Sequence, residues 1–173
     1  MEGYMKKHSL VIILGFLGIF SLNAATVSVL VVEAGLPPGN GCTPSAGVWE
    51  SGFMDAFFDA GHIVSNAPCM QIDPVLNTNA DLASPRVLPR EVNSDFDQAR
   101  VGGAEFFVLV ILDYKDGNPD YPKEVLIRIF RVSTGDLIYE TKVAARAWAN
   151  NDEEFLDVKG HAGKIIPVLS KKG

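Results

Sequence analysis

The sequence is poor in the residues that most often carry chemistry. Of its 173 residues only two are cysteines and only three are histidines. No Gly-Lys-Ser or Gly-Lys-Thr step is present for a phosphate-binding loop, and Pro44 follows Gly39 and Gly41 where a dinucleotide fingerprint needs its third glycine. Beyond residue 25 the only histidines are His62 and His161, and neither has a serine or cysteine nucleophile in an elbow-like context. These absences disfavour nucleotide chemistry and a hydrolase triad.

Long runs of one charge are also absent. If the first 25 residues are set aside, Lys6, Lys7 and Glu2 leave the count of 15 basic and 21 acidic side chains. The remainder then holds 13 basic and 20 acidic side chains, a net charge of about −7. An acidic, mixed surface of this kind disfavours nucleic acid and anionic lipid as partners.

No apolar stretch is long enough to predict a membrane-spanning helix. The stretch at residues 10–20 has 11 residues, whereas a bilayer needs ~20 residues of helix. Lys6 and Lys7 precede it and the small or polar segment 21–25 follows, which is typical of a cleaved secretory signal. We therefore expect residues 1–25 to be removed and the product to be periplasmic or secreted. Because no cysteine stands directly after the expected cleavage point, no stable membrane anchor is expected.

Residues 26–173 predict one α/β domain. The expected sheet is mixed and five-stranded, with three parallel strands and an antiparallel hairpin, in the order βαβ–loop–αβββ–α and packed as a two-layer or three-layer sandwich. The expected strands are residues 26–33, 62–66, 105–113, 124–132 and 137–145, and the expected helices begin near residues 44, 95 and 151. Residues 68–93 predict a long inserted loop, since they include four prolines and show no sustained periodicity.

Three details of the helices follow from residue preferences. Ser94 is a candidate cap for the helix at 95–101. Asn151 and Glu154 have the spacing of a capping box for the last helix. Gly160 and Pro167 weaken that helix, so a kink or an early end is expected.

The even cysteine count in an exported chain favours a disulfide between Cys42 and Cys69. The two residues follow the first and second parallel strands, which end at the same edge of a sheet, so the bridge is geometrically sensible. Metal ligation or a reactive thiol is the alternative, but no other thiol or histidine lies near in spacing. Neither a metal site nor a cofactor is expected.

Two groups of residues are candidates for contact with other molecules. Glu33 and Asp113 end two strands that are possible neighbours, where they could hold a cation or small ligand or act as acid and base. Alternatively, both residues are simply exposed to solvent at the ends of their strands. Trp148, together with Arg86 and Arg90 of the inserted loop, is a candidate partner surface. A buried tryptophan is the alternative at position 148.

Several segments together resemble a group of bacterial envelope domains. They are the buried strand TVSVLVVE at 26–33, the helix-to-strand segment FMDAFFDAGHIVSN at 53–66, the small-residue step into a strand at 99–109, and the hairpin with Thr134 and Gly135. The group includes the N-terminal domain of the Tol translocation protein, the curli secretion lipoprotein, and lipoprotein activators of penicillin-binding proteins. The resemblance implies an α/β fold and a docking or assembly role without shared catalytic residues.

The sequence thus predicts an exported, non-catalytic envelope protein that binds other envelope proteins, with a homo-oligomer as a further option. The alternative is an exported small-ligand-binding protein or hydrolase that uses the strand-end carboxylates.

Overall fold

The structure is a computed structural model that describes residues 24–37, 41–72, 90–114, 119–144 and 146–170. Its strands are β1 (Thr26–Ala34), β2 (Ile63–Asn66), β3 (Met70–Ile72), β4 (Phe106–Asp113), β5 (Glu124–Arg131) and β6 (Asp136–Ala144). Its helices are α2 (Pro44–Asp59), α4 (Asn93–Val101), α5 (Asn151–Leu169) and the short 3-10 turn η1 (Arg90–Val92).

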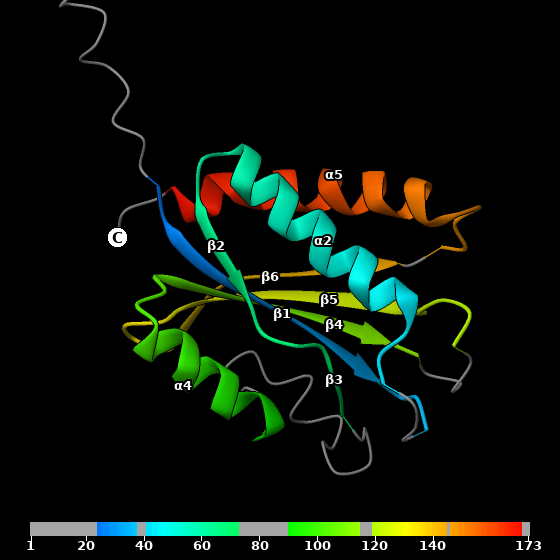
Figure 1. Cartoon of the computed structure of the whole chain (residues 1–173), viewed down its shortest axis with the longest axis horizontal. Coiled ribbons are helices and arrows are strands. Elements are labelled where there is room, and N and C mark those ends of the chain that lie inside the picture. The colour runs from blue at the N-terminus through cyan, green and yellow to red at the C-terminus, as the bar shows by residue number, and fades with distance from the viewer. Residues whose placement is uncertain (1–23, 38–40, 73–89, 115–118, 145, 171–173) are drawn as a thin grey trace, which may run out of the picture.

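One mixed sheet organises the described residues, with strand order β2-β1-β4-β5-β6 (Figure 1). β1 pairs in parallel with β2, β3 and β4, while β5 and β6 add an antiparallel hairpin to β4. The predicted α/β sandwich with parallel strands and an edge hairpin is therefore confirmed. β1 and β4 lie in the middle of the sheet, which explains why their sequences are apolar on both faces.

Helices cover both faces of the sheet, so the sandwich has three layers (Figure 1). α2 and α5 lie on one face over the odd-numbered residues of β1, such as Val27 and Val29. α4 lies on the other face, where Phe96 and Ala99 pack with Leu30. The alternation of side chains along a strand, with a period of two, sends successive residues into these two separate cores.

The sheet has six strands, one more than the sequence predicted. The additional strand is β3, which lies inside the segment 68–93 that was predicted to be a loop throughout. β2 pairs with the first half of β1 and β3 with its last three residues, from Val32 to Ala34. A strand of three residues is too short to show the alternation by which strands are recognised. The rest of that segment, 73–89, lies outside the described residues.

The predicted helix starts near residues 44 and 151 are confirmed, whereas the start predicted at residue 95 is wrong by two residues and the predicted cap of the last helix by one. α4 begins at Asn93 after η1, without a side-chain cap from Ser94. In α5 the cap is Asn150, whose Oδ1 accepts a hydrogen bond from the Glu153 amide, while the Glu153 carboxylate accepts one from the Ala149 amide. Asn150 and Asn151 carry the same side chain, and so do Glu153 and Glu154. The sequence alone therefore does not show which of each pair forms the cap.

α5 does not end early, although it contains Gly160 and Pro167. Its stripe of Val158, Ala162 and Ile165 is buried against α2 and the sheet. Tertiary packing of this kind outweighs the helix propensity of single residues. None of the helices in the described part of the chain is long and apolar enough to cross a membrane.

Ala25 already belongs to the folded domain. Its side chain is 3% exposed, its amide donates to His62 Nδ1 at 3.1 Å, and its carbonyl accepts from the Ile63 amide at 3.0 Å. Ala25 therefore packs with the domain, while the domain boundary predicted between residues 25 and 26 stays a prediction.

Candidate functional site

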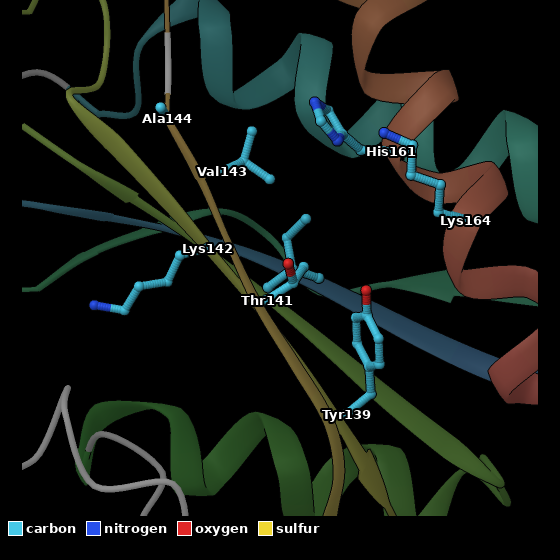
Figure 2. A pocket seen from close by; sticks show the side chains of 8 residues that line it. Tyr139, Thr141, Lys142, Val143, Ala144, His161 and Lys164 are labelled. Carbon is cyan, nitrogen blue, oxygen red and sulfur yellow. The ribbon is translucent and has the colours of Figure 1, made fainter.

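A groove of about 320 Å³ runs between β6 and α5 (Figure 2). On the β6 side it is lined by Tyr139, Thr141 and Val143, which alternate along the strand and face the helical layer. His161 and Lys164, one turn apart on α5, form the opposite wall. The groove therefore combines apolar surface with hydroxyl groups and a lysine.

β6 forms an edge of the sheet. Among the described residues it pairs with β5 alone, so the backbone groups on its other side have no strand partner there. Glu140 and Lys142 point to the face opposite the groove, opposite Arg128 and Leu126 of β5 in the register. An unpaired edge strand of nine residues is a template for pairing with another chain.

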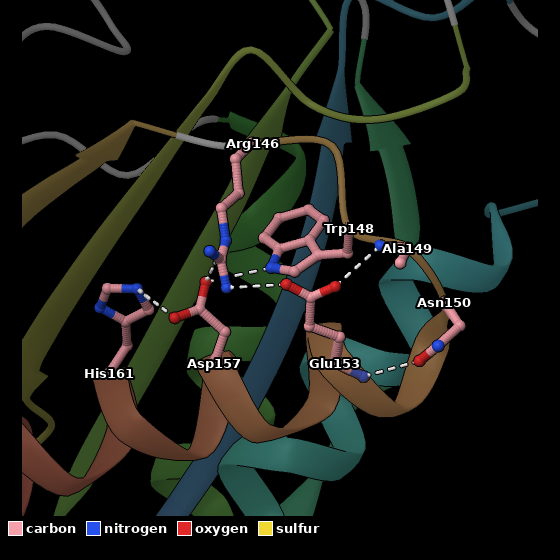
Figure 3. Close-up of polar contacts among 7 residues, drawn as sticks. All are labelled: Arg146, Trp148, Ala149, Asn150, Glu153, Asp157 and His161. Carbon is pink, nitrogen blue, oxygen red and sulfur yellow. Dashed lines mark hydrogen bonds and ion pairs between the residues drawn. The ribbon is translucent and has the colours of Figure 1, made fainter.

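Trp148 lies in the connection from β6 to α5 and is held in a polar cluster (Figure 3). Its indole N–H donates to Asp157 Oδ2 at 3.0 Å, and its ring meets Trp49 edge-on with centroids 6.3 Å apart. Arg146 bridges Glu153 at 3.2 Å and Asp157 at 3.5 Å. Trp148 is thus half-buried and fixed, an intermediate between the exposed anchor and the core residue considered from the sequence.

His161 links this cluster to the groove. Its ring stacks on Trp49 with centroids 6.3 Å apart, and its Nε2 lies 3.9 Å from Asp157 Oδ1. Burial lowers the pKa of His161; Asp157 opposes this effect and Lys164 adds to it. The direction of this shift favours the neutral imidazole, which contributes a flat polar surface to the groove.

Glu33 is fully buried in a second polar cluster at the end of β1. Its carboxylate accepts hydrogen bonds from the Thr43 amide at 3.0 and 3.1 Å, from the Thr43 hydroxyl and from Gln71 at 3.3 Å. Tyr114 Oη lies 3.4 Å from Glu33 and 3.0 Å from Thr43, and burial raises the pKa of Tyr114 to about 12. These bonds tie β1 to the start of α2, so Glu33 acts as a structural acceptor.

The structure does not bring Glu33 and Asp113 together. In the β1–β4 register Asp113 is opposite Ala34, so Asp113 lies on the α4 face of the sheet. Glu33 pairs with Leu112 and faces the helical layer of α2 and α5. The sequence analysis could place both residues at strand ends, but a one-residue difference in register puts them on opposite faces.

The predicted partners Cys42 and Cys69 are joined in a disulfide, with Cα atoms 6.3 Å apart. Together with Glu33 they offer three possible metal-ligand atoms within 4.8 Å of one another. Zinc and related metals bind the thiolate form of cysteine. In the bonded state this group is therefore a covalent link and not a metal site.

Of the two arginines proposed for a partner surface, Arg86 and the side chain of Arg90 lie outside the described residues. Sequence reasoning missed another arginine. Arg128 of β5 is only 1% exposed and pairs with Glu140 of β6 at 2.8 Å. The position of Arg128 on a strand with a neighbour on each side is the feature that could have indicated its burial.

Comparisons with known proteins give distant likenesses only. No protein-family model matches the sequence, and no curated protein does. Among solved structures, the PelC dodecamer from Paraburkholderia phytofirmans is 12% identical with a TM-score of 0.44, over 87% of this chain and 90% of that one. The LpoB C-terminal domain from Escherichia coli is 16% identical with a TM-score of 0.40, over 79% and 93%.

Lipoprotein GNA1162 from Neisseria meningitidis is 12% identical with a TM-score of 0.43, over 83% of this chain and 96% of that one. All three are distant likenesses, with TM-scores of 0.44, 0.40 and 0.43. At such low identities and scores they support no assignment of function.

Proposed function

We propose that this chain is an exported protein-binding or assembly module of the bacterial cell envelope, without catalytic activity, and that β6 and its groove form the binding surface. The observation that carries the proposal is the open edge of β6. Extended segments add to such edges through backbone hydrogen bonds, while a neighbouring groove accepts alternate side chains and supplies specificity.

The side chains around this edge suit recognition. Tyr139 and Thr141 offer hydroxyl groups inside the groove, the exposed Lys164 forms part of its wall, and the exposed Lys142 lies on the other face of β6. Arg146 and the fixed ring of Trp148 lie just beyond the end of β6. Aromatic and arginine side chains that are held in place lose little entropy on binding and often dominate interface energies.

The absence of catalysis is part of the proposal. It rests on the separation of Glu33 from Asp113 and on the engagement of Glu33 by Thr43. A hydrolase that used these two carboxylates would need both on one face, close to a bound substrate.

Site-specific photo-crosslinking in intact bacteria tests the function. A photoreactive amino acid at Lys142, which is exposed on β6, should give covalent adducts with envelope protein. The matched control is Val101 at the end of α4, which is 87% exposed and lies on another surface of the domain. Adducts at 142 and none at 101 would support the proposal; equal labelling at both positions, or none at 142, would contradict it.

A further inference from the structure

We propose that β6 pairs antiparallel with β6 of a second copy of this chain, about a two-fold axis at Thr141, and so joins two sheets into one. This inference rests on the proposed function, because it names the partner of the same edge. It is based on the side chains that would lie opposite each other if two β6 strands were placed side by side.

The two edges of the sheet differ. On one side β1 is followed by the short strands β2 and β3, of four and three residues. On the other side β6 is nine residues long. Its exposed positions 140, 142 and 144 alternate with half-buried ones at 139, 141 and 143. From Tyr139 to Ala144 this strand pairs with β5 without a register shift, and the irregularity in the pairing lies between Leu137 and Tyr139. A long exposed edge is the one suited to strand addition.

A two-fold axis at Thr141 places complementary residues opposite each other. Glu140 of each copy is then opposite Lys142 of the other, which gives two pairs of opposite charge. Tyr139 is opposite Val143, also twice, and aromatic residues pair well with β-branched ones across strands. Both kinds of contact favour the same register.

The adjacent registers lack this complementarity. An axis at Glu140 would place two glutamates directly opposite each other, and an axis at Lys142 would place two lysines there. Like charges directly opposite destabilise a strand pair. A register is specified when one alignment satisfies the side chains and its neighbours do not, and the sequence of β6 meets this condition around Thr141.

The pairing also preserves the layers of the domain. An axis perpendicular to the sheet leaves Tyr139, Thr141 and Val143 of both copies on the face that carries α5. The two grooves then lie next to each other across the junction, and each strand extends the floor of the other copy's groove. The interface is isologous, as is usual for homodimers.

Cysteine cross-linking tests the register. Opposite residues on antiparallel strands have Cα atoms roughly 4.5–5.5 Å apart, within the range that a disulfide can bridge. Under mild oxidation of the folded protein, Thr141→Cys should therefore form a covalent dimer. Tyr139→Cys and Val143→Cys are matched controls that should not cross-link with themselves, whereas a mixture of these two variants should form the mixed dimer.

A charge variant gives an independent measurement. In Lys142→Glu both charge pairs become repulsive, so dimer association should weaken by about tenfold, measured by sedimentation against Lys142→Arg as a control. Equal cross-linking of all three single cysteine variants, or a monomer at every concentration without a cross-link at 141, would overturn the inference. If photo-crosslinking at 142 then captured a different envelope protein, the proposed function would stand while the homodimer would not.

Discussion

Gly52 of α2 lies where this helix approaches α5 most tightly among the described glycines, and Gly52→Ala should destabilise the domain. A Cβ atom at this position would lie 2.6 Å from Val158 Cγ1 and 3.0 Å from Val158 Cβ. Val158 is fully buried, so it has little room to move. Alanine would gain about 1 kcal/mol from helix propensity, but overpacking costs about 1–3 kcal/mol. The expected net effect is a loss of about 1 kcal/mol.

Gly47 provides the matched control in the same helix. It is exposed, and nothing lies within 4 Å of the Cβ that alanine would add. Gly47→Ala should therefore stabilise the domain by up to ~1 kcal/mol. Urea unfolding with the disulfide intact would measure both variants. A second substitution, Val158→Ala, should relieve the clash, so the double variant should lose less stability than the two single losses combined. If Gly52→Ala stabilises the domain as much as Gly47→Ala does, α2 and α5 do not pack at Gly52 as closely as the structure shows.

Three further predictions concern the covalent link, the pH dependence and the start of the folded chain. Replacement of both Cys42 and Cys69 by alanine should lower the free energy of unfolding by about 3–4 kcal/mol, since the bridge spans 27 residues; an unchanged urea midpoint would contradict this. Burial lowers the pKa of His62 from 6.5, although Glu105 partly opposes the shift, so the unfolded chain binds more protons below about pH 6.5. The free energy of unfolding should therefore be highest above that pH and should decrease as the pH falls. His62→Asn should weaken this decrease in urea titrations, and an unchanged pH profile of the variant would contradict the prediction. Because Ala25 is bonded within the fold, we expect export to cut before it, after Ala24, and a mature mass that begins at Thr26 would contradict that expectation.

The sequence predicts the main elements of this fold because each carries a strong local pattern. β1 and β4 are apolar throughout, as strands buried on both faces must be, and Pro44 marks the start of α2. β3 escapes prediction because three residues carry no period, and its pairing with β1 is a tertiary event. The end of α5 escapes prediction for a related reason, since burial of Ile165 and Leu169 extends the helix past the glycines.

The candidate site is less accessible to sequence reasoning. Trp148 was singled out, and it does lie beside the groove, but its fixed position depends on Asp157 and on Trp49 of another helix. Glu33 was recognised as a strand-end carboxylate, yet its role is decided by Thr43, ten residues away in the loop before α2. The hairpin of β5 and β6 was predicted at one edge of the sheet, but the sequence pattern did not show that β6 is its outer strand or that a groove adjoins it.

Amide hydrogen exchange along β6 tests the central claim most directly. Exchange is measured in dilute protein, in concentrated protein and in the presence of envelope extract, with β2 at the other edge of the sheet as the internal reference. We expect the outward-facing amides of β6 to exchange quickly in dilute solution and to become protected in concentrated solution, while β2 stays unchanged. Exchange of β6 that is the same under all three conditions would contradict the claim that this edge is a protein-binding surface.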